Sequence, residues 1–262
     1  MGVLNVTPDS FFDGGRYSQL SPALDRAASI VAEGAGIIDV GGESTRPGSE
    51  SVDEAVEMQR VIPLIESIAA RFDIAISIDT SKLSVMAAAV GAGASIVNDV
   101  YALRAAGARA WAASTAAGVC LMHMQGEPRT MQEHPHYGDV VAEVVGFLQG
   151  EREACIAAGI GSEAIALDPG IGFGKSLAHN LTLLRELRSL VALGSPVLVG
   201  VSRKSLIGRV LGGRALEERL HGGLGLAALA VATGANIIRT HDVAPTVDVI
   251  RMVDAVLRGR ET

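Results

Sequence analysis

AIALDPGIGFGKS, residues 164–176, is a short apolar run followed by an acid, a glycine-rich turn and a lysine. The four apolar residues 164–167 stand between Glu163 and Asp168, and so short a run is typical of a fully buried strand. Asp168 therefore stands at the carboxyl end of a strand. The glycines allow a tight turn that approaches a ligand closely, and a helix is predicted to start just after Lys175.

Two nucleotide-binding motifs resemble this turn, and the residues exclude both. A Walker A loop requires glycine five places before the Gly-Lys-Ser of residues 174–176, where this chain has Pro169. The glycines at 170, 172 and 174 do not have the GxGxxG spacing either. A lone Asp-Pro-Gly is common in ordinary turns, so the meaning of Asp168 depends on whether other strands end in the same way.

The same unit, an apolar run followed by a turn-rich loop and an amphipathic helix, recurs along the whole chain. Eight apolar runs are predicted as strands, at residues 3–6, 36–40, 74–78, 95–97, 119–122, 164–167, 197–201 and 236–238. Strands that alternate with helices over about 260 residues predict a closed (β/α)₈ TIM barrel of the α/β class, with one domain spanning residues 1–262. An open doubly wound sheet is the second choice, because the dinucleotide fingerprint is missing.

Local signals predict where the helices begin and end. Ser21-Pro22 is predicted as an N-cap with proline in the first turn, and Ser51 with Glu54 as a capping box. Pro63 is expected to kink the second helix. Glycines in the left-handed conformation are expected to end helices at positions 34, 91, 118, 159 and 234.

Composition excludes several classes of protein. The chain has 262 residues, of which 48% are hydrophobic, so it can bury a large core. A formal net charge of −7 argues against nucleic-acid binding. The sequence shows no cationic-then-apolar leader and no apolar run near eighteen residues. We therefore expect neither secretion nor membrane spanning. Cys120 and Cys155 form no disulfide framework, so we expect reduced thiols in a cytoplasmic protein.

The long polar stretch at residues 123–139 contains two histidines, His134 and His136, on either side of Pro135. Two histidines without a third ligand nearby favour a surface loop over a metal site.

Ligand sites of such barrels lie at the carboxyl ends of the strands, and here those ends are polar. The residues at or just after them are Asn5, Asp39, Asp79, Asn98, Asp99, His123, Asp168, Ser202, Arg203, Lys204, Ser205, Arg239, Thr240 and His241. Acids and amides stand on strands one, three, four and six, whereas cations gather after the seventh and eighth. Helix capping alone does not produce that division.

The division indicates a ligand with a flat heterocycle and a phosphate. Carboxylate and amide groups at Asp79, Asn98 and Asp168 suit the donor and acceptor edge of a ring, and are costly to bury without a partner. Lys204, Arg239 and His241 stand where barrels commonly bind phosphate. Asn5 offers an oxygen to a hard cation such as Mg²⁺. Phenylalanines at positions 11, 12 and 173 lie in glycine-rich loops, where they suit ring stacking.

Seven segments together resemble the bacterial dihydropteroate synthases, in order and over essentially the whole chain. They are NVTPDSF at 5–11, GGESTRPGS at 41–49, SIDT at 77–80, ND at 98–99, LDPGIGFGK at 167–175, SRKS at 202–205 and RTHD at 239–242. The resemblance implies a TIM barrel that condenses 6-hydroxymethyl-7,8-dihydropterin pyrophosphate with 4-aminobenzoate, with Mg²⁺ as cofactor. It also implies a homodimer formed through the later helices.

The resemblance further implies a role for each matching position. The pterin would be held by Asp79, Asn98, Met122, Asp168, Phe173, Gly200 and Lys204. The pyrophosphate would be held by Asn5, Thr45, Arg239 and His241, with Asn5 also a metal ligand. The 4-aminobenzoate would meet Phe11, Thr45, Arg46, Pro47 and Ser205. Residues expected to act in catalysis are Asp13, Arg46, Asp79, Asp168 and Lys204.

One consequence of these roles concerns specificity. Arg239 and His241 are expected to meet only phosphate, so they should not affect binding of a phosphate-free pterin.

The chain also departs from the family pattern, which often has serine at the place of Phe12 and extra residues before the first strand.

Two rival functions make different demands on the sequence. The methyltetrahydrofolate domain of corrinoid methyltransferases shares the barrel and the pterin-binding acids, but does not need the cations at residues 202–204 and 239–241. An inactive homologue that binds pterin and acts through a partner would be marked by loss of Phe11, Arg46 or Lys204, and all three are present.

Overall fold

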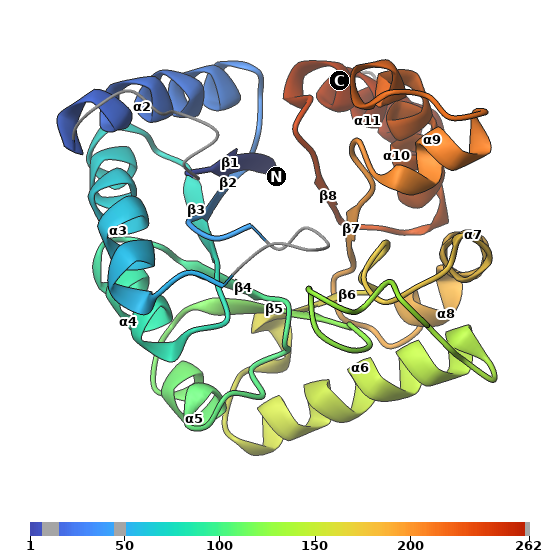
Figure 1. The fold of residues 1–262 in the computed structure, drawn as a ribbon, viewed down its shortest axis with the longest axis horizontal. Helices are drawn as coiled ribbons and strands as arrows, with labels where there is room; N and C mark the ends of the chain where they lie inside the picture. Colours follow the sequence, from blue (N-terminus) through green and yellow to red (C-terminus); the bar gives the residue numbers. More distant parts are fainter. Residues whose placement is uncertain (7–15, 45–50, 260–262) are drawn as a thin grey trace.

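The structure, a computed structural model, describes residues 1–6, 16–44 and 51–259 of the chain. Eight parallel strands in this described part form a ring that the helices surround (Figure 1). The strands are β1 (Gly2–Asn5), β2 (Ile37–Gly41), β3 (Ala75–Asp79), β4 (Ile96–Asp99), β5 (Gly118–Met122), β6 (Ile165–Asp168), β7 (Leu198–Gly200) and β8 (Ile237–Arg239). Each lies within a few residues of its predicted run.

Backbone hydrogen bonds close the ring at the two places where the six-stranded and two-stranded sheets meet. Strands β1 to β6 pair in order as one sheet, and β7 pairs with β8. The amide of Leu167 in β6 donates to the carbonyl of Pro196 at 2.8 Å, which joins β6 to the segment entering β7. The amide of Val3 donates to the carbonyl of Thr240 at 2.9 Å, which joins β8 to β1. The predicted TIM barrel is therefore confirmed.

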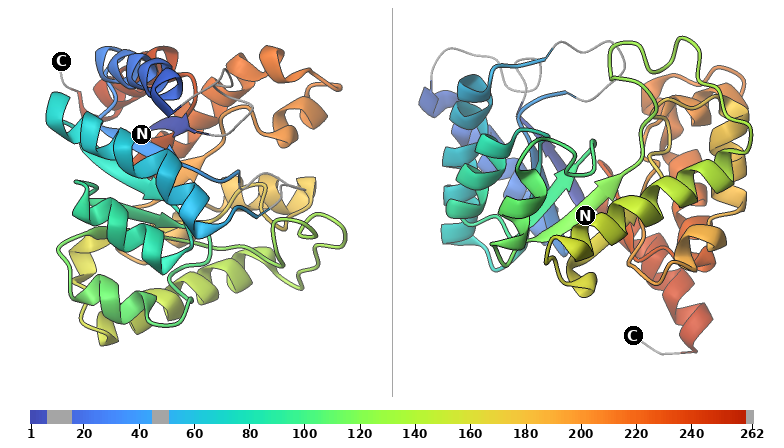
Figure 2. Two further views of the ribbon diagram at one scale, coloured as in Figure 1. Left: turned by 60° about the vertical axis from the view of Figure 1, so that its left-hand side comes forward. Right: turned by 90° about the horizontal axis from the view of Figure 1, so that it is seen from below.

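The helices lie outside the strands, as the side views show (Figure 2). They are α2 (Arg16–Ala32), α3 (Glu54–Arg71), α4 (Leu83–Gly91), α5 (Ala108–Ala113), α6 (Val140–Ala157), α7 (Leu177–Arg185), α8 (Arg188–Val191), α9 (Ser205–Val210), α10 (Leu220–Thr233) and α11 (Val243–Arg258), with 3₁₀ turns η1 (Ser162–Ala164) and η2 (Leu216–Arg219). No helix among these described residues is long and apolar enough to cross a membrane.

The two faces of each strand have different surroundings. Outward side chains such as Ile38, Val40 and Ile78 are fully buried against the helices. The inward face is polar, because Asp39 of β2 pairs in register with Ser77 of β3 and both side chains are fully buried. Alternation along a strand then places the next inward residue of β3, Asp79, one layer closer to the barrel mouth.

Both predicted helix starts are wrong. Helix α2 begins at Arg16 and contains Pro22, so it tolerates the loss of one backbone hydrogen bond instead of starting at Ser21. Helix α3 has Asp53 as its N-cap residue, without a side-chain cap bond. Glu54 accepts a hydrogen bond from Ser84 on α4 at 2.5 Å, so its carboxylate serves a neighbouring helix rather than a capping box.

Three of the five predicted glycine ends are confirmed. Gly34, Gly159 and Gly234 have positive φ angles just after α2, α6 and α10. The other two predictions are wrong, because Gly91 is the last residue of α4 and Gly118 is the first of β5. The expected kink at Pro63, which lies inside α3, stays a prediction.

Candidate active site

The carboxyl ends of the strands bring distant polar residues to one mouth of the barrel. Asn5 is in register with Gly41, Gly41 with Asp79, and Asp79 with Asn98, across four adjacent strands. Farther round, Met122 is in register with Asp168, and Gly200 with Arg239. The predicted pterin residues of the described chain therefore share one rim.

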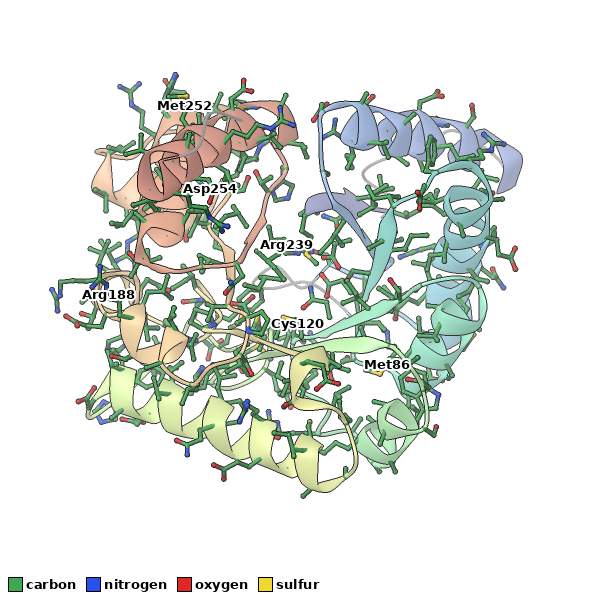
Figure 3. The ribbon with its side chains drawn as sticks, turned by 180° about the vertical axis from the view of Figure 1, so that it is seen from behind. Met86, Cys120, Arg188, Arg239, Met252 and Asp254 are labelled. Carbon is green, nitrogen blue, oxygen red and sulfur yellow. The ribbon has the colours of Figure 1, made fainter. Side chains whose placement is uncertain are left out.

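Arg239 points into the barrel and joins two acids. Its Nε lies 2.6 Å from Oδ2 of Asp39, and its Nη2 lies 2.8 Å from Oδ2 of Asp79. Figure 3 shows the Arg239 label, like that of Cys120, near the centre of the ring of strands. Burial disfavours the guanidinium charge, but the two carboxylates outweigh burial and raise the pKa of Arg239. Acids and cations that lie on different strands along the sequence are therefore in contact inside the folded barrel.

Asp79 and Asn98 present acceptors toward the mouth. The Nδ2 of Asn98 donates to Oδ2 of Asp39 at 3.3 Å, which leaves the oxygen of that amide as the group for a ligand. Oδ1 of Asp79 is buried and has no hydrogen-bond partner in the described part of the chain. Burial raises the pKa of Asp79 to about 7, although Arg239 opposes the shift. A buried acceptor without a partner is costly, so it indicates a ligand that donates an N–H.

Asp168 and Lys204 lie on the opposite part of the rim. Oδ1 of Asp168 accepts a hydrogen bond from the amide of Gly170 at 2.7 Å. Burial raises the pKa of Asp168 against the charge of Lys204. Burial lowers the pKa of Lys204 to about 8 against the charge of Asp168. The ammonium of Lys204 donates to the carbonyl of Ile171 and lies 4.6 Å from the ring centroid of Phe173, which is a cation–π contact.

His241 lies between β8 and α11 and is held by Ser202. Oγ of Ser202 is 3.1 Å from the His241 amide and 3.2 Å from its Nδ1. Arg203, predicted as one of the strand-seven cations, is exposed and pairs with Asp242. His241 also lines an outer hollow of about 450 Å³ together with Arg26.

The structure adds two buried polar residues, in contact with the strand-end residues, that the sequence prediction did not assign to the site. Asp39 is fully buried and holds both Arg239 and Asn98. Lys175 is 2% exposed, and its Nζ lies 2.9 Å from Nδ1 of His123. The available sequence signals were an acid inside the apolar run of β2 and a lysine directly after a glycine-rich turn.

The remaining predicted residues are distributed as follows. Met122 is buried, Gly200 and Phe173 are partly buried, and Ser205 is exposed as the first residue of α9. The predicted residues Phe11, Asp13, Thr45, Arg46 and Pro47, together with Phe12, lie outside the described residues. His134 and His136 are exposed, and the described chain contains no cluster of three side chains suited to a metal ion.

Known proteins share this sequence and fold. The pterin binding enzyme family matches residues 1–241. The dihydropteroate synthase of Escherichia coli (strain K12) is 51% identical over 261 residues, which cover 100% of this chain and 92% of that protein. The enzyme of the same name from Haemophilus influenzae is 47% identical over 255 residues, covering 97% of this chain and 92% of that protein.

Solved structures agree with the sequence relatives. A Yersinia pestis dihydropteroate synthase in complex with a sulfonamide drug has a TM-score of 0.92 and 47% identity, covering 98% of this chain and 93% of that chain. A Xanthomonas albilineans dihydropteroate synthase with 4-aminobenzoic acid has a TM-score of 0.92 and 46% identity, covering 98% and 92%. The chain therefore belongs to the pterin-binding enzyme family, among the dihydropteroate synthases.

Proposed function

We propose that this transferase condenses 6-hydroxymethyl-7,8-dihydropterin pyrophosphate with 4-aminobenzoate, releasing pyrophosphate and 7,8-dihydropteroate for folate synthesis. The observation that carries the proposal is the set of buried acceptors at one barrel mouth. Asp79, Asn98 and Asp168 stand on three strands there, with the ammonium of Lys204 beside them. Full-length similarity to dihydropteroate synthases supports it.

The pterin pocket follows from the atoms that these residues present. Oδ1 of Asp79 and the carboxylate of Asp168 would accept N–H groups of the ring, and the amide oxygen of Asn98 would accept another. Lys204 would donate to a ring oxygen or nitrogen. Met122 and Gly200 at strand ends, with Phe173 in the loop after β6, would line the same space, so that a flat ring would meet apolar walls and a polar edge.

The pyrophosphate is assigned to Asn5, Thr45, Arg239 and His241. Mg²⁺ fits this site as an ion that arrives with the substrate, because the described residues offer it the oxygen of Asn5 but no cluster of three ligating side chains. Mg²⁺ commonly binds through one or two protein oxygens together with substrate phosphates. When bound, it would neutralise charge on the leaving pyrophosphate.

The chemistry breaks a carbon–oxygen bond to pyrophosphate and forms a carbon–nitrogen bond to the aryl amine, which then loses a proton. Loss of pyrophosphate leaves positive charge on the pterin, and the carboxylates of Asp79 and Asp168 stabilise that charge. Ser205, at the start of α9 beside Lys204, would meet 4-aminobenzoate with Phe11, Thr45, Arg46 and Pro47. Asp13 and Arg46 are assigned to catalysis through their loops.

We also propose a cytoplasmic homodimer. Helix α11 exposes Met252 by 66% and Val256 by 76%, four residues apart on one face, and Leu229 of the adjoining α10 is 49% exposed. Apolar side chains clustered in this way are typical of a subunit interface. The two buried cysteines, Cys120 and Cys155, are free thiols, which suits the cytoplasm.

Release of pyrophosphate is the direct test of the reaction. The assay supplies pterin pyrophosphate with or without 4-aminobenzoate, and with or without Mg²⁺. We expect release that depends on all three components. Release that is equally fast without 4-aminobenzoate would indicate a pyrophosphatase and contradict the proposal.

A further inference from the structure

The loop between β6 and α7 is held by side chains at every carbonyl from residue 170 to residue 174. The carbonyls of Gly170 and Phe173 accept from Lys175, that of Ile171 from Lys204, that of Gly172 from Gln132 and that of Gly174 from Tyr137. The loop contains three glycines with positive φ, and its backbone forms a turn bond from the amide of Phe173 to the carbonyl of Gly170 at 3.0 Å. Its conformation depends on these side-chain donors.

Lys175 is the donor with the most contacts. Its Nζ lies 3.0 Å from the carbonyl oxygen of Gly170, 2.9 Å from that of Phe173, and 3.2 Å from that of His123. It also lies 2.9 Å from Nδ1 of His123, whose pKa is lowered to about 3 by burial, so that a neutral imidazole faces the ammonium. No carboxylate of the described residues forms an ion pair with Lys175.

A lysine buried in this way is expensive. Burial lowers the pKa of Lys175 to about 7, although the nearby charge of Asp168 opposes the shift. An apolar side chain fills buried space at a lower free-energy cost, because a buried charge carries a large desolvation cost. The four contacts of Nζ therefore indicate that the donor itself is needed.

The loop backbone packs directly against the segment that follows β5. Two of the loop glycines have no room for a side chain there. A Cβ at Gly170, where φ is +64°, would lie 2.0 Å from the carbonyl oxygen of His123. A Cβ at Gly174 would lie 2.2 Å from the carbonyl oxygen of Gln125. Lys175 reaches across this close backbone contact and joins the loop to β5 through His123.

The same loop sets the positions of three proposed pterin-binding groups. The amide of Gly170 donates to Asp168 at 2.7 Å. The carbonyl of Ile171 accepts from Lys204, and the ring of Phe173 lies against that ammonium. A shift of the loop would therefore displace a carboxylate, a cation and an aromatic wall together.

We propose that Lys175 is a positioning residue for the pterin site, which acts by fixing the loop through the carbonyls of Gly170 and Phe173. Lys175 does not touch the substrate in this arrangement. It holds Asp168 and Lys204 at the separation that the ring requires. The inference rests on the proposed function, since it assigns Lys175 to the pterin pocket.

The test compares three variants of the full chain. Lys175→Met keeps the length of the side chain without donors or charge. Lys175→Gln keeps an N–H donor without charge, and serves if the Met variant does not fold. Tyr137→Phe is the matched control, because it removes one donor to the same loop, at Gly174, and no charge. Thermal unfolding establishes that each variant is folded.

Calorimetry with phosphate-free 6-hydroxymethylpterin measures the site itself. We expect Lys175→Met to weaken binding by roughly tenfold or more, as loss of buried charged hydrogen bonds does, and Tyr137→Phe to weaken it far less. In steady state, the KM for the pterin pyrophosphate should rise more than kcat falls. The KM for 4-aminobenzoate should change little.

A pH profile separates positioning from general stability. The titratable and charged groups that face Asp168 are Cys120 on β5, Lys175, Lys204 and Arg239. The acid limb of pterin binding requires both Asp79 and Asp168 to be ionised. Removing the positive charge of Lys175 favours the protonated form of Asp168, so this limb should move to higher pH. Both Lys175 variants should show this shift, and Tyr137→Phe should not.

The outcomes separate failure of the proposed function from failure of the positioning role of Lys175. Wild-type protein that binds no pterin would overturn the proposed function. Wild-type protein that binds pterin, together with Lys175 variants whose affinity and pH profile match those of Tyr137→Phe, would overturn the positioning role alone.

Discussion

Arg239 joins the phosphate side of the site to the pterin side. The expectation from sequence was that Arg239 meets only phosphate, but its Nη2 lies 2.8 Å from the proposed pterin ligand Asp79. Removing the guanidinium would leave Asp79 and Asp39 buried beside each other without a counterion, which costs more than the loss of a surface pair. Its effect therefore extends to the ring.

We expect Arg239→Ala to weaken both the pterin pyrophosphate and phosphate-free 6-hydroxymethylpterin. His241→Ala should weaken only the pyrophosphate ester, because His241 is assigned to pyrophosphate and its Nδ1 lies 3.2 Å from Oγ of Ser202, beyond the end of β7. Calorimetric titration of each variant with both ligands measures the difference. Unchanged affinity of Arg239→Ala for the phosphate-free ligand would show that Asp79 does not depend on Arg239.

The pKa values of two buried groups predict a bell-shaped pH dependence. Asp79 ionises as the pH rises through about 7, and Lys204 loses its proton as the pH rises through about 8. Affinity for 6-hydroxymethylpterin should therefore rise through pH 7 and fall above pH 8. Lys204→Met should lose the alkaline limb and keep the acid limb. A flat profile between pH 5.5 and 9.5 would contradict both assignments.

The same shifts lower stability in opposite pH ranges. The folded pKa of Asp79 is raised, so its cost to folding grows as the pH rises from about 4 to about 7 and is constant above that. The folded pKa of Lys204 is lowered, so its cost grows as the pH falls from about 10.5 to about 8. These costs are typical of groups that are retained for function.

Residues at strand ends could be predicted from sequence, whereas their partners could not. Asp79, Asn98 and Asp168 follow apolar runs, so a barrel fixes where they stand. Asp39 contacts Arg239 across 200 residues, and Lys175 contacts His123 across 52. No local pattern encodes such pairs, because they depend on which side chains meet inside the closed ring.

At the scale of elements, the junction of the β6–α7 loop with its helix is held by a cap. Oγ of Ser176 accepts from the amide of His179, and Nδ1 of His179 accepts from the amide of Ser176, both at 3.2 Å. Helix α7 has only nine residues, so its start matters.

We expect Ser176→Ala to lower the free energy of unfolding by about 0.5–2 kcal/mol, measured by urea denaturation. Ser114→Ala is the control, because Ser114 is an exposed-face donor at the end of α5 and caps no amide. Equal losses from the two substitutions would show that the cap contributes nothing specific.

Strands were predicted more accurately than helix starts for a physical reason. A parallel strand in a barrel is buried on both faces, so its apolar run marks it almost residue by residue. A helix start depends on competing local contacts. Glu54 accepts a hydrogen bond from Ser84 instead of closing a capping box, and α2 includes Pro22 in its interior rather than in its first turn.

At the scale of the whole molecule, the exposed apolar face of α11 is the proposed dimer interface. Figure 3 shows Met252 at the outer edge of the molecule, far from the central ring of strands. We expect Val256→Glu to convert the protein to a monomer in sedimentation velocity, because it places a charge in the apolar interface. Val56→Glu on α3, where valine is 38% exposed, is the control and should leave the dimer intact. A Val256→Glu protein that remains dimeric would place the interface elsewhere.

The two substrate sites differ in how much of each is built into the barrel. The proposed pterin ligands stand at strand ends with fixed partners, such as Asp39 for Asn98 and Gly170 for Asp168. The proposed 4-aminobenzoate residues come mainly from the glycine-rich loops at residues 7–15 and 41–48. Glycine-rich loops lose conformational entropy when they close over a ligand, and a small aryl acid makes too few contacts to offset that loss.

We therefore expect ordered binding, with the pterin pyrophosphate first. A sulfonamide or 4-aminobenzoate should show little heat of binding to the free protein, and clear binding once a pterin, pyrophosphate and Mg²⁺ are present. Phe11→Ala should weaken the second substrate and spare the first, whereas Asp168→Asn should weaken the first and thereby abolish the second. Tight sulfonamide binding to the ligand-free protein would show that the second pocket exists before the pterin arrives, because only a preformed site avoids the cost of ordering the loops.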